Sequence, residues 1–140
     1  MVKGTQYTLG EHSVVLTRAV ALLWCDISDV PFDPEFPHPS LAYQVAMEGV
    51  SYPKVFDIVD IGPDDIAVAG EIAIDVRRPV TIGCIYRVSA SIADIEHKVG
   101  ARMGPFERIA IVSEARRDGV CDSDFVVNVS ILVSRGSPPS

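Results

Sequence analysis

Cysteine and basic residues are both scarce in this chain. The three cysteines, Cys25, Cys84 and Cys121, are odd in number and widely spaced. They predict reduced residues of a cytosolic protein, and neither a disulfide framework nor a zinc site. Lysine and arginine total 12 against 19 acidic residues, which gives a net charge of -7. Because no basic stripe is present, a nucleic-acid backbone is excluded as the partner.

Long apolar runs and the common catalytic motifs are also missing. The most apolar helix-like stretch spans roughly twelve residues, too few to cross a bilayer. Residues 1–10 lack the apolar centre of a signal peptide. The sequence has no Gly-x-Ser-x-Gly elbow, no phosphate-binding glycine loop, and no acidic cluster joined by histidine or cysteine. We therefore expect a cytoplasmic protein with no membrane span, no metal site and no nucleophilic catalyst of a common type.

Apolar residues, by contrast, are abundant. They make up 48% of the 140 residues, which indicates a buried interface in addition to a core. No repeat or linker divides the chain, so residues 1–140 are expected to form one domain. Residues 136–140 are a short Pro/Ser segment with nothing to bury, and we expect them to fray.

The stretch HPSLAYQVAMEG (residues 38–49) predicts a buried helix over about residues 40–48. Ser40 is a typical N-cap residue, and Gly49 stands where a left-handed C-terminal cap would lie. Four apolar residues recur at helical spacing between them: Leu41, Ala42, Val45 and Ala46. A short helix that is apolar on most sides is expected to be a core helix.

Helical patterns come before strand patterns along the chain. Residues 12–26 have the spacing of an amphipathic helix, residues 26–39 are rich in proline, and residues 50–62 contain a short helical turn. Alternating apolar residues then predict four strands at about residues 66–77, 81–94, 106–116 and 120–135. Glycine-rich turns join the last three strands as hairpins. This order predicts an α+β fold with a segregated antiparallel sheet.

Three segments resemble the MaoC-like hydratases and dehydratases, a hot-dog family. Residues 77–90 (RRPVTIGCIYRVSA) are similar to its strand-turn-strand, with Pro79 and Gly83 at the spacing of the family's Pro-x-x-x-Gly break. Residues 113–135 resemble its last two strands, and residues 25–36 (CDISDVPFDPEF) resemble its hydratase motif, Gly-Asp-x-Asn-Pro-x-His-x-Asp-Pro-x-Phe. The resemblance implies a hot-dog fold, in which a long curled sheet wraps a central helix.

The hydratase motif is incomplete here. Asp26 matches its catalytic aspartate, but Pro31 stands at the position of its histidine. Asp33 and His38 have the same Asp-x4-His spacing, so they form an alternative, shifted pair with His38 as the base. The resemblance implies that such a pair moves protons while water adds to, or leaves, C3 of an acyl thioester.

The helix end and the basic residues supply further candidate groups. The backbone amides of Ser40 and Leu41 at the helix N-terminus are predicted to stabilise a thioester oxyanion. The resemblance implies CoA or phosphopantetheine as part of the substrate and no separate cofactor. Five basic residues around the sheet are candidates for the phosphates of that arm: Arg77, Arg78, Arg87, Lys98 and Arg102.

Three functions remain open. The first is hydration or dehydration at the 2,3-position of an acyl-CoA or acyl-carrier thioester, by a homodimer or by a heterodimer with a second hot-dog subunit. HPSLAYQ (residues 38–44) resembles the degenerate halves of two-subunit enzymes, which shape the acyl pocket and lack the catalytic pair. The second is thioester hydrolysis, with water activated by Asp26, Asp33 or Glu48. The third is a non-catalytic acyl-binding or assembly module.

Overall fold

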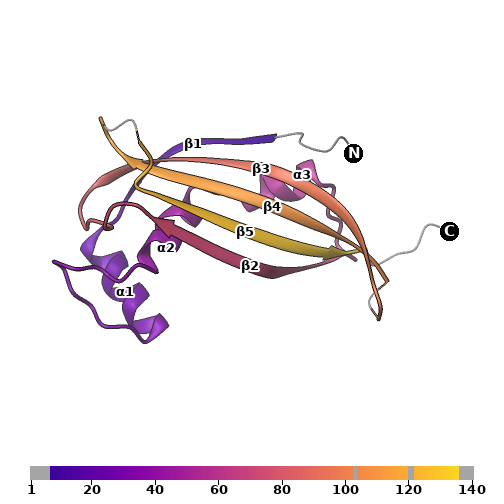
Figure 1. Ribbon diagram of the computed structural model, residues 1–140, viewed down its shortest axis with the longest axis horizontal. Helices are drawn as coiled ribbons and strands as arrows, with labels where there is room; N and C mark the ends of the chain where they lie inside the picture. Colours follow the sequence, from indigo (N-terminus) through magenta and orange to yellow (C-terminus); the bar gives the residue numbers. More distant parts are fainter. Residues whose placement is uncertain (1–6, 103, 120–121, 136–140) are drawn as a thin grey trace.

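Five strands and three helices make up the part of the chain that the computed structural model describes, residues 7–102, 104–119 and 122–135 (Figure 1). In chain order they are β1 (Tyr7–Val15), α1 (Arg18–Ser28), α2 (Leu41–Glu48), α3 (Tyr52–Ile58), β2 (Ile66–Val76), β3 (Ile85–Gly100), β4 (Gly104–Arg117) and β5 (Phe125–Ser134). The predicted tail at 136–140 and Cys121 lie outside the described residues.

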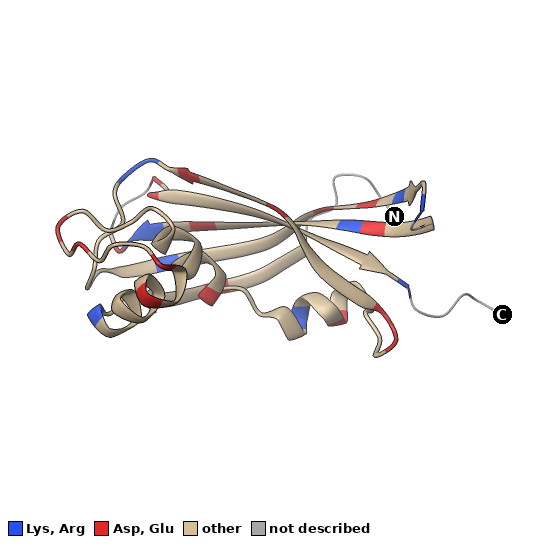
Figure 2. Cartoon of the chain, turned by 90° about the horizontal axis from the view of Figure 1, so that it is seen from below, with Lys and Arg blue, Asp and Glu red and all other residues tan. Residues whose placement is uncertain are grey.

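All five strands belong to one antiparallel sheet in the order β1-β3-β4-β5-β2. The sheet curls lengthwise, and the helices lie on one side of it (Figures 1 and 2). β3, β4 and β5 are consecutive hairpin strands, as their turn signals predicted, while β1 and β2 form the two edges.

Helix α2 is the centre of the core. Its residues Leu41, Ala42, Val45 and Ala46 are at most 1% exposed, and they share one apolar cluster with inward-facing residues of β3 and β5. The buried Ser113 of β4 donates a hydrogen bond of 2.9 Å from its Oγ to the carbonyl oxygen of Ala46, so no polar group is left unpaired at this contact. The predicted central helix wrapped by a curled sheet, the hot-dog fold, is confirmed.

The predicted helix over residues 12–26 is wrong in its first part. Residues up to Val15 belong to β1, which pairs with β3. Helix α1 begins only at Arg18, where the Thr17 side chain accepts a hydrogen bond of 3.2 Å from the Val20 amide. The apolar spacing before this point fits either element, and pairing with β3 selects the strand because it buries Val14 and the edge of β3.

Gly49 ends α2 for a different reason from the one predicted. Its φ is -82°, so it does not adopt the left-handed conformation. A Cβ atom at this position would lie 2.4 Å from Val88 Cγ1 and 2.8 Å from Val88 Cβ. Glycine is therefore required by the close approach of α2 to β3, and not by backbone conformation.

Gly49→Ala is expected to lower the free energy of unfolding by about 1–3 kcal/mol, because the new methyl group overpacks the contact with β3. Adding Val88→Ala should restore part of that stability, since it removes Cγ1, the nearer of the two atoms that collide, and leaves only Cβ. Chemical denaturation of the single and double variants measures both effects. Equal losses for Gly49→Ala in the presence and absence of Val88 would show that crowding by Val88 is not the cause.

Candidate functional site

Three side chains meet at the N-terminal end of α2. Trp24 of α1 donates a hydrogen bond of 2.9 Å from Nε1 to Ser40 Oγ. The same Oγ lies 2.8 Å from Nδ1 of His38, and the Ser40 amide donates to that Nδ1 at 3.2 Å. The loop between α1 and α2 thus brings His38 into contact with the serine that precedes the core helix.

These contacts assign the proton on the His38 ring. Indole Nε1 only donates, so the Ser40 hydroxyl oxygen accepts from Trp24. The Ser40 amide also only donates, so Nδ1 of His38 is an acceptor and the ring hydrogen is assigned to Nε2, which leaves the Ser40 hydroxyl as a second donor to Nδ1. His38 offers an N–H donor to a ligand, and not the free lone pair that the sequence prediction of a base required.

Two further contacts hold the same loop against the helices. The Arg18 guanidinium lies 5.0 Å from the centre of the Phe32 ring, a cation–π contact. The Trp24 and Tyr43 rings are 6.0 Å apart, so Trp24 is fixed by packing as well as by its hydrogen bond. The positions of Ser40 and His38 thus depend on side chains from both α1 and α2.

The two predicted acids lie outside this cluster. Asp26 is an exposed residue of the last turn of α1. Asp33 is exposed, and its Oδ1 accepts hydrogen bonds from the amides of Glu35 and Phe36, at 2.9 and 3.1 Å. In the described residues no hydrogen bond joins Asp33 to His38, so the predicted pair is not formed within this chain.

The predicted oxyanion amides are already paired. Ser40 N donates to His38 Nδ1, and Leu41 N donates to the carbonyl oxygen of His38 at 3.0 Å. Ser40 was predicted to cap the helix with its side chain, but it does not. Its hydroxyl makes hydrogen bonds with Trp24 and His38 instead. An oxyanion at this end of α2 would have to replace one of these bonds.

Four of the five basic residues proposed for phosphate binding form ion pairs with carboxylates. The pairs are Arg77 with Asp75, Arg78 with Asp122 and Asp124, Arg87 with Glu11 and Asp118, and Lys98 with Glu96. The pairing with Arg87 holds the pKa of the Glu11 carboxyl below its usual value. Arg102 is exposed in the turn after β3 and has no ion pair within the described ranges.

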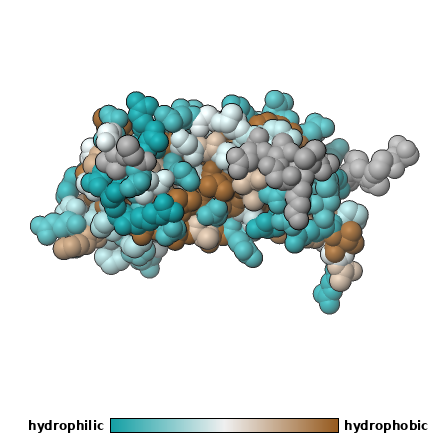
Figure 3. Space-filling model, turned by 45° about the horizontal axis from the view of Figure 1, so that its top comes forward, coloured by the Kyte–Doolittle hydropathy of each residue, from teal (hydrophilic) through white to brown (hydrophobic). Residues whose placement is uncertain are grey.

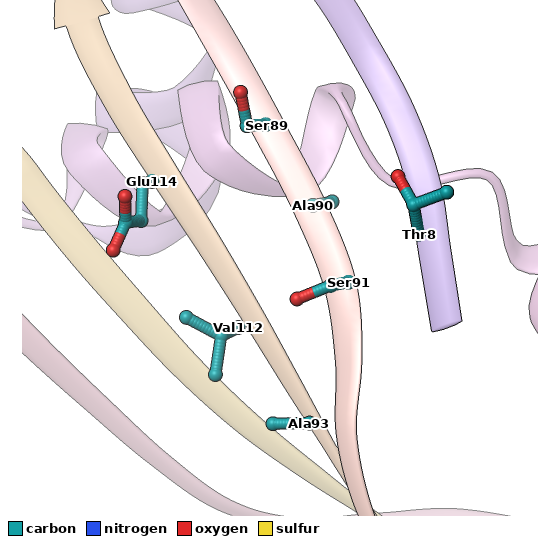
Figure 4. Close-up of a pocket in the computed structure, with 7 residues that line it drawn as sticks. All are labelled: Thr8, Ser89, Ala90, Ser91, Ala93, Val112 and Glu114. Atoms are coloured by element: carbon teal, nitrogen blue, oxygen red, sulfur yellow. The ribbon is translucent and has the colours of Figure 1, made fainter. Parts of the chain in front are cut away.

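A hollow of about 540 Å³ lies on the sheet face turned away from α2 (Figure 4). Its lining residues are mostly small or hydroxylic: Thr8, Ser89, Ala90, Ser91, Ala93, Val112 and Glu114. Figure 3 shows hydrophobic residues gathered in the middle of one face of the molecule. The hollow is separated from His38 by the sheet, so the two features are not parts of one site.

Residues 7–102, 104–119 and 122–135 contain no group of three or more histidine, cysteine or acidic side chains that could hold a metal ion. Within the same ranges no helix has the length and apolar character needed to cross a membrane.

Sequence reasoning missed Trp24 as part of the site. Trp24 and Ser40 are 16 positions apart, so no local pattern connects them. The only signal in the sequence is composition: Trp24 is the one tryptophan of the chain. A buried indole needs an acceptor, but the sequence does not say which one.

No protein-family model matches the sequence, and no curated protein is similar enough to count as a relative. Solved structures are similar in fold. One is the HadBC (3R-hydroxyacyl-ACP dehydratase) complex from Mycobacterium tuberculosis, with 11% identity, a TM-score of 0.70, and coverage of 94% of this chain and 97% of the other. Another is a MaoC-like dehydratase, with 10% identity and a TM-score of 0.67 over 94% of this chain and 42% of the other.

A third similar structure is the fluoroacetyl-CoA thioesterase FlK, with 16% identity and a TM-score of 0.56 over 95% of this chain and 87% of the other. This chain spans less than half the length of the MaoC-like dehydratase. At these identities the comparisons establish the hot-dog fold, which hydratases, dehydratases and thioesterases share.

Proposed function

We propose that this protein acts on acyl thioesters, by adding or removing water at the 2,3-position of an acyl-CoA or acyl-carrier substrate. The main support for the proposal is that His38 is held at the N-terminal end of the core helix, with its Nε2–H available to a ligand. The fold similarity to dehydratase structures supports the same substrate class.

In this proposal His38 is a hydrogen-bond donor. Its Nε2–H, fixed by the hydrogen bonds at Nδ1, stabilises the thioester oxygen as negative charge builds up on it in the enolate. In dehydration a separate base takes the proton from C2 and returns it to the hydroxyl that leaves from C3, and hydration is the reverse. Ser40 and Trp24 act as positioning residues, since they reach the substrate only through the histidine ring.

The base must then be a different group. Asp26 and Asp33 are both exposed, and neither contacts His38 within the described residues. We therefore place the base on a second hot-dog subunit, which makes this chain the pocket-forming member of a two-subunit site. The substrate carries CoA or phosphopantetheine, and no further cofactor is needed for the reaction.

Thioester hydrolysis is the second candidate, and two observations favour it. FlK, described as a fluoroacetyl-CoA thioesterase, shares the fold. Glu48 on the exposed side of α2 accepts a hydrogen bond of 2.8 Å from Gln44 Nε2, which orients its carboxylate. A carboxylate held in this way could activate water against the thioester carbonyl carbon, the role that the sequence assigned to Asp26, Asp33 or Glu48.

The test is a hydration assay with crotonyl-CoA, alone and after co-expression with a hot-dog subunit that carries an intact aspartate–histidine motif. Loss of absorbance of the conjugated double bond reports hydration, and release of free thiol reports hydrolysis. Hydration supports the first proposal, and thiol release supports the second. A folded protein with neither activity in either setting would contradict both and favour the binding module.

A further inference from the structure

Gln44 of α2 carries a buried polar atom that has no partner. Its Oε1 is shielded from solvent and accepts no hydrogen bond within the described residues, although an amide oxygen can accept two. Two other buried atoms also lack a hydrogen bond, Arg117 Nε and Asp124 Oδ2, but these lie 2.8 Å from each other. A shielded acceptor without a partner costs free energy, so Gln44 Oε1 calls for a donor that the described chain does not supply.

The orientation of the Gln44 amide is fixed by its other polar atom. Nε2 donates a hydrogen bond of 2.8 Å to Glu48 Oε2, one turn further along α2. A flipped amide would place Oε1 against the carboxylate, acceptor against acceptor, so this contact identifies which atom is the nitrogen. Because the nitrogen and the oxygen diverge from the same carbon atom, Oε1 points away from Glu48 and back toward the preceding turn.

The preceding turn is the one that contacts His38. The backbone amide of Gln44 donates to the carbonyl oxygen of Ser40 at 3.4 Å, so the two residues stand one turn apart on the same side of the helix. Ser40 contacts the His38 ring through both its hydroxyl and its amide. One turn advances the helix by about 5.4 Å. The unpaired acceptor of Gln44 therefore follows the His38 donor along α2 at about this spacing.

The inward side of α2 is closed to a ligand. Val45 is 0% exposed, and α2 approaches β3 so closely at Gly49 that a Cβ atom there would collide with Val88. A ligand that binds His38 must therefore extend along the outward side of α2. Gln44 is on that side, because only part of its side chain is buried and its amide contacts the exposed Glu48.

We propose that Gln44 binds the oxygen at C3 of the substrate. Its Oε1 accepts a hydrogen bond from the hydroxyl of a 3-hydroxyacyl thioester, or from the water that adds to C3 in the opposite direction. The inference rests on the proposed function, because it takes the thioester oxygen to be bound by His38. The two oxygens of such a substrate are separated by C1, C2 and C3, a spacing that suits groups on successive turns of a helix.

The chemistry of the acceptor selects this occupant. An amide oxygen binds a donor, and a hydroxyl group or a water molecule is a donor small enough for a shielded position. A saturated acyl group would leave Oε1 unpaired, so the site should discriminate against it. Gln44 is thus a substrate-binding residue that favours hydroxylated acyl groups, and Glu48 positions it.

The first test measures binding by calorimetry, in complex with a second hot-dog subunit whose catalytic aspartate is replaced by asparagine, so that the ligand is not converted. The unmodified protein should bind 3-hydroxybutyryl-CoA about ten-fold more tightly than butyryl-CoA, which lacks the hydroxyl. Gln44→Met keeps the length of the side chain and removes the acceptor, so it should bind both thioesters equally. Asn128→Leu changes an exposed amide opposite Val112 on the other sheet face, and this matched control should keep the preference.

A second measurement separates this role from a structural one. Gln44→Met removes a shielded acceptor that has no partner, so the midpoint of chemical denaturation should not fall. A lower midpoint with an unchanged preference for the hydroxylated thioester would make Gln44 a structural residue and overturn the inference. If His38→Ala weakens binding of both thioesters in that case, the proposed function still stands. Binding of neither thioester by the unmodified complex would overturn both proposals.

Discussion

His38→Ala is expected to reduce the hydration rate of crotonyl-CoA, assayed together with the second hot-dog subunit, by about 10²–10³-fold, the usual contribution of one positioned donor to an oxyanion. The variant removes the Nε2–H donor and leaves the fold nearly intact, because His38 is only partly buried. The ring also accepts a hydrogen bond from the Ser40 amide, so a loss of about 1 kcal/mol in unfolding free energy is expected as well. Initial rates and denaturation curves on the same preparations separate the two effects.

His12→Ala is the matched control, because His12 is an exposed histidine of β1 with no side-chain hydrogen bond or ion pair among the described residues. Its activity should equal that of the unmodified protein. Asp33→Asn should also retain most activity, since Asp33 bonds only to the amides of its own turn. Full activity in His38→Ala would remove His38 from the mechanism, whereas a large loss in Asp33→Asn would restore the Asp33/His38 pair that the sequence predicted.

Replacing both Arg78 and Arg117 with methionine is expected to lower the free energy of unfolding by about 3–5 kcal/mol, because it leaves a buried carboxylate without a partner. Asp124 is 0% exposed. Its Oδ1 accepts a hydrogen bond of 2.9 Å from Arg78 Nη1, and its Oδ2 lies 2.8 Å from Arg117 Nε, where the atoms are close but not aligned as a hydrogen bond.

Each single methionine variant should lose clearly less than the double variant, since one guanidinium remains beside the carboxylate. Adding Asp124→Asn to the double variant should recover part of the loss, because the buried negative charge is gone. Arg87→Met serves as the comparison: its ion pair with Glu11 is exposed to solvent, and thermal unfolding should change little. A double variant as stable as the unmodified protein would show that Asp124 is not held by these arginines.

The start of β5 differs from the strand predicted at residues 120–135. The turn at Asp118 and Gly119 is present, but β5 begins only at Phe125. Asp124 stands just before it, and its carbonyl oxygen accepts hydrogen bonds from the amides of Arg77 and Arg78. The sequence contained the turn signal, but not the long-range contact between Asp124 and the end of β2.

The sequence by itself determined the core helix and the three hairpin strands. Apolar residues at helical spacing over 41–46 and alternating residues after Ile66 are local patterns, and the burial they predict needs no knowledge of the partner surface. The first part of the chain was ambiguous because a local pattern can fit more than one element. The spacing around Val14 fits a helix or a strand, and only the contact with β3 made it β1.

The candidate site was decided by tertiary structure. The sequence identified His38 and Ser40, but their positions depend on Trp24, which reaches Ser40 from another helix and donates a hydrogen bond to its hydroxyl oxygen. It also paired Asp33 with His38 from spacing alone, and the loop folds so that Asp33 bonds to its own turn instead. Sequence patterns record which residues share a face of one element. Hydrogen-bond partners across elements depend on packing distances and directions, which no single stretch of sequence contains.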